Sequence, residues 1–453
     1  MKSPSIDGVK TWAGRGLSLF GLLFLLFFWT GASFSQPPHH VRTKVRFWHM
    51  WTAEWKDVVD KIVKRYNDSQ DVYEVEALSV PSAGADSKFI LGVLGGDPPD
   101  VMAQWNPIIP PWAEGHLLRP LDELMTPAEK ADFDRQAYPV VKKMGTYKGK
   151  LYGMSIGMNM FGLYYLPDHL KEAGLDPSKP PQTLEELDAM GKKLDKFDAN
   201  GNLTRLGWLP TNYMIFAAVF GGGFYDWNGE RLTMDTPENL RALQYISDSN
   251  KALGFGNVQR FNSGLDTQSS AGGWPFIGGA YSFIVDGAWR VEQIAKYAPQ
   301  LHYETCPIPP PKGGKPLAGF SSGNFMVVPT SAKEPKGAWD FIKFWSGLEN
   351  PNVAAEFYTW GGWLPLTPAI AQSPIYQAYL HKFPQFKTFV DLMPSENETV
   401  LPPVPFQTFF NDHIGTTEES VTHGTLTATQ ALRGFAKTVN AEANRRKELG
   451  YDR

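Results

Sequence analysis

The sequence predicts an α/β protein built as two lobes, and two observations lead to this prediction. The first is an alternation of strand and helix patterns over residues 41–105, which is typical of folds in which helices cover a mostly parallel sheet. The second is the length of 453 residues, because chains longer than about 250–300 residues divide into more than one core. The content of 42% hydrophobic and 20% charged residues is ordinary for a folded globular protein.

The alternation begins with Val41 to Trp48, whose period of two predicts the first strand. Glu54 to Asn67 carries apolar residues at helical spacing and predicts the first helix. Val72 to Val80 is expected to form the second strand, and Ser87 to Leu94 the second helix. This order of elements favours a doubly wound α/β lobe.

A Gly-Gly-Asp-Pro-Pro run at residues 95–99 must end the second helix, because proline removes a backbone donor and restricts the residue before it. Asp100 to Trp105 follows as a short, mostly apolar stretch and predicts a buried strand. In open α/β sheets ligands bind beyond the carboxyl ends of strands. We therefore expect the last two residues of this strand, Gln104 and Trp105, at a binding site. The alternative, in which Trp105 lies in the core and Gln104 is a capping side chain, stays open.

The composition excludes several classes of function. The formal net charge of −4 shows no basic excess of the kind that nucleic-acid binding requires. The single cysteine, Cys306, allows no intrachain disulfide and no cysteine-based metal cluster, and we expect it to be buried. Asp198 to Asn202 resembles a calcium loop only faintly, because the twelfth position is Leu209, so we expect a turn there. We therefore expect no metal and no cofactor.

The N-terminus has the pattern of a secretory signal. Lys2, Lys10 and Arg15 precede the apolar run Leu17 to Trp29, and small residues follow it. The run is shorter than the roughly 20 residues that span a bilayer. We expect residues 1–35 to be a signal peptide and the mature chain to be exported to the periplasm. No cysteine follows the apolar run in this N-terminal segment, so we expect no lipid anchor.

Several segments together resemble the extracellular solute-binding proteins of bacterial ABC sugar importers, the maltose-binding-like group. They are the helix-GDPPDV-strand pattern, the Gly-Ala-Trp turn inside Gly272 to Gln293, the stretch Pro307 to Val328, and the turn Trp360 to Pro365. The resemblance runs over Val41 to Asn444 in the expected order. It implies a type II periplasmic-binding-protein fold, with hinged lobes and a ligand cleft between them.

The same resemblance implies the boundaries of the lobes. Lobe 1 is expected to comprise residues 41–155 and 308–358, and the helix-rich lobe 2 residues 156–307 and 359–453. The glycines within Tyr147 to Tyr165 give the first crossing the freedom of a hinge.

The residues expected in the cleft are mostly aromatic or neutral and polar. Aromatic rings cover the apolar faces of sugars, and amides and carboxylates bind the hydroxyl groups. The expected ligand-binding residues are Trp48, Trp51, Gln104, Trp105, Asn159, Tyr225, Trp227, Asp286, Trp289, Asn324, Trp360 and Trp363. For each tryptophan a place in the core stays an alternative, as does a turn for Asn159 and a helix cap for Asp286.

The resemblance implies a monomeric binding protein that captures a mono- or oligosaccharide by lobe closure and delivers it to an ABC permease. One alternative keeps the fold but binds a polyol or a glycerol-phosphate ester, for which Arg290 is the only basic residue beside the best cleft motifs. Another is a secreted glycan-active enzyme. Asp286 and Glu54 are available carboxylates for it, but no motif pairs them, and His49 has no partner spaced to orient it. A third is a non-transport receptor.

Overall fold

The computed structural model describes residues 41–265 and 274–450. The chain divides into two units, Met1–Val41 and Arg42–Arg453, and every element below belongs to the second. The predicted signal peptide, residues 1–35, lies outside the described residues. Within those residues no helix combines the length and the apolar character that a membrane crossing requires.

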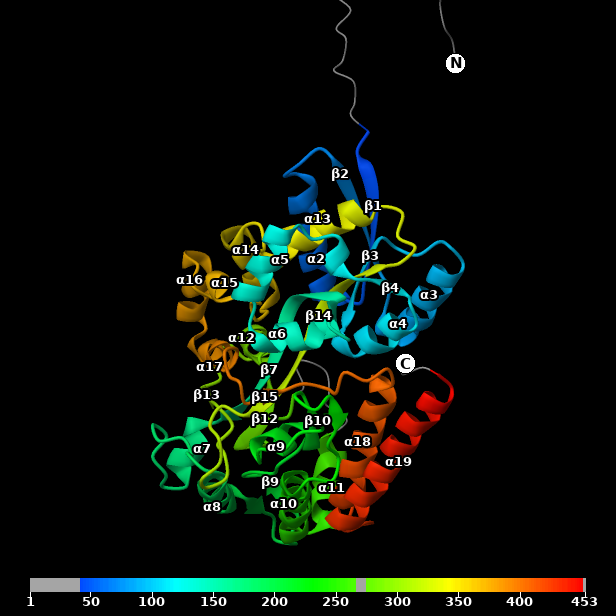
Figure 1. The fold of residues 1–453 in the computed structure, drawn as a ribbon. Coiled ribbons are helices and arrows are strands. Elements are labelled where there is room, and N and C mark those ends of the chain that lie inside the picture. The colour runs from blue at the N-terminus through cyan, green and yellow to red at the C-terminus, as the bar shows by residue number, and fades with distance from the viewer. Residues whose placement is uncertain (1–40, 266–273, 451–453) are drawn as a thin grey trace, which may run out of the picture. The chain divides into compact units, whose positions relative to one another are not determined.

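The predicted alternation of strands and helices is confirmed at the N-terminal side of the sheet. The elements are β1 (Thr43–His49), α2 (Ala53–Asn67), β2 (Tyr73–Ser79), α3 (Ser82–Leu94) and β3 (Val101–Trp105). β1 pairs in parallel with both β2 and β3. Helix α3 begins earlier than the expected Ser87 and ends at Leu94, directly before the Gly-Gly-Asp-Pro-Pro run. This part is drawn in blue and light blue in Figure 1.

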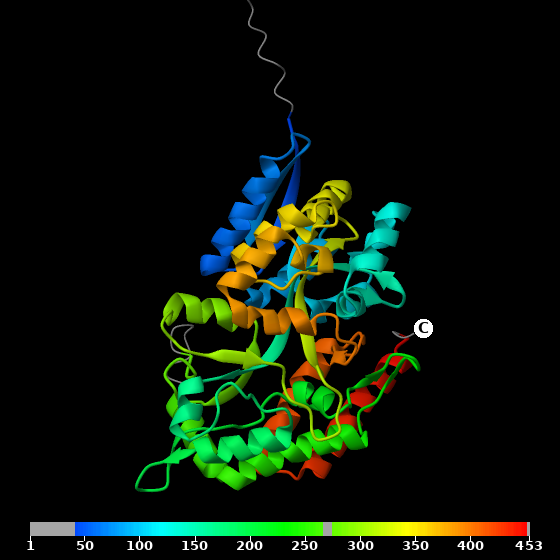
Figure 2. The ribbon, with the colours of Figure 1, turned by 90° about the vertical axis from the view of Figure 1, so that its left-hand side faces the viewer.

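Two long strands connect the two halves of the unit. β7 (Gly153–Tyr165) is antiparallel to β14 (Gly319–Pro329) and to β12 (Phe283–Gly287), and the sheet order is β12-β7-β14-β3-β1-β2. Leu151 belongs to the short β6 (Lys150–Leu151), and β7 runs without interruption through Gly157. Figure 2 shows both long strands passing between the two groups of helices.

Two large hydrophobic cores correspond to these halves. The first contains Val45, Met154 and Phe325, and the second contains Leu163 and Phe320, so β7 and β14 each contribute to both. Around the first core lie α4 (Ile109–Glu114), α5 (Pro127–Gln136), α6 (Pro139–Gly145), α13 (Pro335–Ser346), α14 (Pro351–Gly361), α15 (Pro368–Ala371), α16 (Pro374–Lys382) and α17 (Lys387–Leu392).

The helices α7 (Pro167–Glu172), α8 (Leu184–Leu194), α9 (Tyr213–Val219), α10 (Pro237–Leu253), α18 (Gln407–Thr422) and α19 (Ala428–Glu448) surround the second core. Helix α11 (Phe255–Leu265) packs in a small cluster of its own beside it. Short elements complete the unit: β4 (Leu118–Arg119), β5 (Thr146–Tyr147), β8 (Lys196–Phe197), β9 (Leu203–Arg205), β10 (Tyr225–Asp226), β11 (Arg231–Leu232), α12 (Trp289–Tyr297), β13 (Glu304–Cys306), β15 (Glu398–Thr399) and the 3-10 turns Asn106–Ile108, Leu121–Glu123 and Pro384–Phe386.

The structure differs from the sequence prediction at the C-terminal side. Leu364, Tyr376 and Leu392 of the segment 359–392, which the sequence assigns to lobe 2, pack in the first core, as do Trp274 and Val291. The chain reaches the second core only after β15. Residues 411–444 form parts of two helices, α18 and α19, because Gly424 takes a positive φ of 69° and Thr427 caps α19 with a complete capping box.

Asp100, directly after the double proline, fastens three segments of the first half. Its buried carboxylate accepts hydrogen bonds from the backbone N–H groups of Arg46 (2.8 Å), Lys333 (2.9 Å) and Glu334 (2.8 Å). One side chain thus links β1, β3 and the segment that leads into α13. The predicted turn at Asp198 is confirmed as well, since its Oδ1 accepts from the N–H groups of Asn200 and Asn202 between β8 and β9.

Candidate functional site

A row of side chains lies on one face of the sheet where the two halves meet. Directly opposite residues of paired strands share a face, and so do residues two apart along a strand. Trp105 is opposite Asn324, and Asn159 is opposite Ser322. Phe161, two residues beyond Asn159, therefore lies on the same face. We call these five residues, with Trp289 described next, the polar–aromatic strip.

Trp289 completes the strip at the β12 end. It is the first residue of α12, and its indole covers Gly287, where an added Cβ would overlap the ring. Gly287 is opposite Phe161, and the Trp289 and Phe161 rings meet edge to face at 5.6 Å and 87°. The glycine is required here because only a residue without a side chain lets the indole approach the strand.

The strip is partly open to solvent. Trp105 is 61% exposed, whereas Asn159, Phe161, Ser322 and Trp289 are half-buried. Asn324 is 5% exposed, and its Oδ1 has no hydrogen-bond partner among the described residues. A buried amide oxygen without a partner costs free energy of about 1–3 kcal/mol. The strip therefore offers exposed aromatic faces and an acceptor that a hydroxyl group can satisfy.

The charged groups beside Trp289 compensate each other. Asp286 on β12 accepts from Arg290 Nε at 2.8 Å and from the Gly287 N–H at 2.7 Å. Burial raises the pKa of Asp286, and Arg290 opposes that shift. The Arg290 guanidinium also donates to Gln293 and stacks at 4.5 Å on the Trp274 ring. A pocket of about 530 Å³ lies against these two residues and is also lined by Thr211 and Tyr281.

Two of the expected cleft tryptophans are core residues. Trp51 stacks on Trp345 at 6.0 Å and 14°, and Trp363 stacks on the same ring at 5.9 Å and 25°. Trp51 and Trp363 are 8% and 6% exposed. Trp363 nevertheless lies over Gly157, which is opposite Asn324, so its indole borders the strip on the same face of the sheet. His49 is buried beside Trp51, and burial lowers the pKa of its imidazole to about 4.

Trp48 and Gln104 point to the opposite face of the sheet, towards α3. Gln104 Nε2 donates to Asp86 at 3.3 Å, and Gln104 Oε1 accepts from the Trp105 N–H at 3.0 Å. Burial raises the pKa of Asp86. Lys88 Nζ lies 4.4 Å from the centroid of the Trp48 ring. Asp86 and Lys88 lie within one turn of α3. The side chains of Gln104 and Trp48 are therefore occupied by contacts with this helix.

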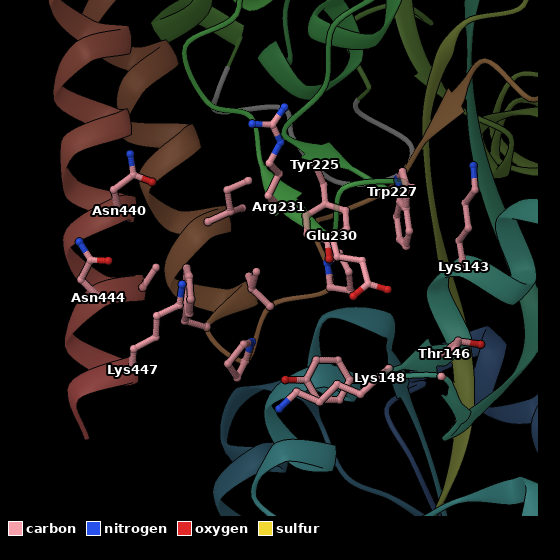
Figure 3. A pocket seen from close by; sticks show the side chains of 18 of the residues that line it. Lys143, Thr146, Lys148, Tyr225, Trp227, Glu230, Arg231, Asn440, Asn444 and Lys447 are labelled. Atoms are coloured by element: carbon pink, nitrogen blue, oxygen red, sulfur yellow. The ribbon is translucent and has the colours of Figure 1, made fainter. Parts of the chain in front are cut away.

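The remaining candidates lie elsewhere. Trp360 on α14 packs under Lys61 of α2, with 3.4 Å between the ammonium nitrogen and the ring centroid. Tyr225 and Trp227, in the β10–β11 hairpin, line a separate hollow of about 900 Å³ (Figure 3).

Sequence reasoning missed Phe161, Ser322 and Asn106. The Asn106 Oδ1 accepts from the Gly323 N–H at 3.2 Å and so positions the end of β3 against β14. Phe161 follows Asn159 by two residues in a predicted strand, and this period of two was an available signal. Ser322 is identified only through its pairing with Asn159, which links residues far apart in the sequence.

The sequence matches one family. The family model of the bacterial extracellular solute-binding proteins covers residues 61–385, and the chain belongs to this family. The resemblance predicted from the sequence is thereby confirmed, and so is the α/β fold with two halves, which the family's two-lobed structures share.

Two relatives illustrate the range of ligands that related proteins are named for. The maltotriose-binding protein of Pyrococcus abyssi is 23% identical, over 73% of this chain and 68% of its own. The sn-glycerol-3-phosphate-binding periplasmic protein UgpB of Yersinia pseudotuberculosis is 24% identical, over 76% of this chain and 78% of its own.

Among solved structures, the mannotriose-bound protein CpMnBP1 is 26% identical and superposes with a TM-score of 0.74, covering 87% of this chain and 99% of its own. The sugar-binding protein MalE of Xanthomonas citri has a TM-score of 0.74 at 21% identity, covering 91% of this chain and 100% of its own.

Proposed function

We propose that this protein is the substrate-binding component of a bacterial ABC importer and that its ligand is a neutral mono- or oligosaccharide. The observation that carries the proposal is the polar–aromatic strip. Trp105, Phe161 and Trp289 present aromatic surface, and Asn159, Ser322 and Asn324 present neutral hydrogen-bonding groups. Sugars have apolar C–H faces and a rim of hydroxyl groups, and they need both kinds of partner.

The proposed mechanism is closure of two lobes around the sugar. One lobe comprises residues 42–158 and 322–392, and the other comprises residues 160–320 and 400–450. The second core lies in the second lobe, whereas the first core also includes Trp274, Val291 and Ile294 of that lobe. The strip crosses from one to the other on β7 and β14, so a ligand bound there contacts both. A ligand shifts the equilibrium towards the closed form only as far as it binds that form more tightly.

We propose the export, location, oligomeric state and permease partner of this protein because the chain belongs to this family. The chain is exported through its N-terminal segment, acts in the periplasm as a monomer, and hands its ligand to the transmembrane subunits of the importer. Catalysis has no part in this role. Asp286 and Glu54, the two carboxylates considered for glycan cleavage, are paired with Arg290 at 2.8 Å and with Lys296 at 3.2 Å.

A glycerol-phosphate ester is the second candidate ligand, because several relatives are named for it. A phosphate requires uncompensated donors, most often arginine or lysine. Arg290 is the cation next to Trp289, and the adjacent Asp286 carboxylate neutralises it. This pairing favours the neutral sugar.

Thermal unfolding with candidate ligands tests the proposal. The mature chain is heated with maltotriose, mannotriose, glucose or glycerol 3-phosphate, since a ligand at 100 times its dissociation constant adds about 2.7 kcal/mol to the free energy of unfolding. We expect stabilisation by at least one neutral saccharide, its loss in Trp289→Ala, and its retention in Trp360→Ala. Stabilisation by glycerol 3-phosphate alone, weakened by salt, would establish the second candidate instead.

A further inference from the structure

The aromatic residues of the polar–aromatic strip form two ends that lie far apart on the sheet. Trp105, at the β3 end, is opposite Asn324 on β14, and Asn324 is opposite Gly157 on β7. Phe161 follows Gly157 by four residues and meets the Trp289 ring at the β12 end. Two strand spacings of about 4.8 Å and a rise of about 3.3 Å per residue place the Cα atoms of Trp105 and Phe161 roughly 16 Å apart. The Trp289 ring lies one strand further, over β12.

The section of the strip between the two ends is polar and uncharged. Asn159 and Ser322 are directly opposite each other and lie between the ends, and Asn324 lies beside the β3 end. Their side chains offer amide and hydroxyl groups. Trp363 borders this section, but its side chain is buried. The strip thus presents two aromatic surfaces that are separated by neutral hydrogen-bonding groups.

The two ends are attached to different halves of the protein. Trp105 is the last residue of β3, and the preceding residues of that strand lie in the first core. Phe161 packs against the second core and contacts the Phe320 ring, with 6.2 Å between the ring centroids. A ligand that is held at both ends therefore connects a strand of the first core with a ring that packs on the second.

Given the sugar-binding role proposed above, we propose that the ligand is an extended oligosaccharide and that its length determines whether the lobes close. A single pyranose ring covers one aromatic end at a time, because the ends are too far apart for one ring to contact both. In an oligosaccharide, the outer rings lie on the two aromatic ends, and hydroxyl groups between them bind the amide and hydroxyl side chains.

A monosaccharide binds at the β12 end, where the Phe161 and Trp289 rings meet at 87° and offer two aromatic surfaces. It leaves Trp105 without a contact. A ligand shifts the lobes towards the closed form only through contacts that favour this form. A sugar that does not reach Trp105 lacks the contact with the first half at that end, so it binds without closing the lobes.

The experiment compares sugars of different length on the mature full-length chain. Calorimetry measures the affinities of mannose and mannotriose and of glucose and maltotriose. Small-angle X-ray scattering with each sugar at saturation measures the radius of gyration, which falls when the lobes close. Trp105→Ala removes the β3 end, and Trp289→Ala removes an aromatic ring of the β12 end. The matched control is Phe197→Ala, which removes a 50% exposed ring on β8, outside the strip.

We expect at least one trisaccharide to bind about 100-fold or more tightly than its monosaccharide and to reduce the radius of gyration, which the monosaccharide leaves unchanged. Trp105→Ala should weaken trisaccharide binding about tenfold or more and leave monosaccharide binding unchanged. Trp289→Ala should weaken the binding of both, and Phe197→Ala the binding of neither.

The outcomes separate the length dependence from the sugar-binding role itself. Equal affinities of monosaccharide and trisaccharide, equal compaction by both, or an unchanged trisaccharide affinity in Trp105→Ala would overturn the length dependence and leave sugar binding intact. Absence of binding by all four sugars would refute the sugar-binding role as well.

Discussion

Replacing Glu398 by glutamine should remove the loss of stability that this carboxyl causes as pH rises from 4.5 to 8. Glu398 lies on β15, the strand that leads from the first half to the second, and is 2% exposed. Its Oε2 accepts from the Ser321 hydroxyl at 2.8 Å, and no cation pairs with it among the described residues. Burial raises the pKa of this carboxyl to about 8.

The sign and size of the effect follow from proton linkage. Between the unfolded pKa near 4.5 and the folded pKa near 8, the folded state holds a proton that the unfolded state has released. The free energy of unfolding therefore falls as pH rises, by about 1 kcal/mol per pH unit. The contribution is complete below pH 4.5 and is lost above pH 8, for a total of roughly 3–5 kcal/mol.

Urea denaturation of the wild type and Glu398→Gln at pH 5, 6, 7 and 8 measures this. Glutamine cannot ionise and still offers Ser321 an acceptor, so the variant should match the wild type near pH 5 and exceed its stability by several kcal/mol at pH 8. The exposed neighbour Glu396, changed to glutamine, serves as the control and should follow the wild type. A stability difference between Glu398→Gln and the wild type that stays constant over this range would refute the reasoning.

Three further predictions test packing and the strip. Asp100→Ala should lower the free energy of unfolding by roughly 3 kcal/mol or more, because three part-buried backbone N–H groups lose their shared acceptor; denaturation curves check this, and a loss below 1 kcal/mol would contradict it. Trp345→Ala should cost about 3–5 kcal/mol through a cavity under Trp51 and Trp363, a result that the same curves report. Gly287→Ala should displace Trp289 and weaken neutral saccharide binding about tenfold or more, which calorimetry measures; unchanged affinity would separate Trp289 from the ligand.

Local signals in the sequence predicted much of the fold. The apolar spacing of residues 54–67 predicted α2, and the Gly-Gly-Asp-Pro-Pro run predicted both the end of α3 and the start of β3. Thr183 and Thr236 are residue types that favour helix starts, and both side chains accept the cap hydrogen bond. These features depend on residues within a few positions of each other, so the sequence carries them directly.

Only the tertiary structure decides whether each tryptophan is buried in the core or exposed at the sheet. Trp51, Trp105, Trp289 and Trp363 all follow a strand or occupy a turn, and nothing local distinguishes them. Trp51 and Trp363 are buried because they contact each other and both stack on Trp345, which is far from Trp51 in the sequence. Trp105, at the end of β3, stays exposed. Burial depends on partners brought by the whole fold, and a pattern along the chain does not contain them.

By itself, the sequence determined the order of strands and helices, the family, and the neutral, aromatic character of the candidate ligand site. Tertiary structure decided which side chains share a face and which half of the protein each segment joins. Ser322 meets Asn159 only because β14 pairs with β7 in one register, and residues 359–392 join the first core because their apolar side chains fit there. Strand register and core packing are set by contacts between distant segments, and the sequence order leaves both undetermined.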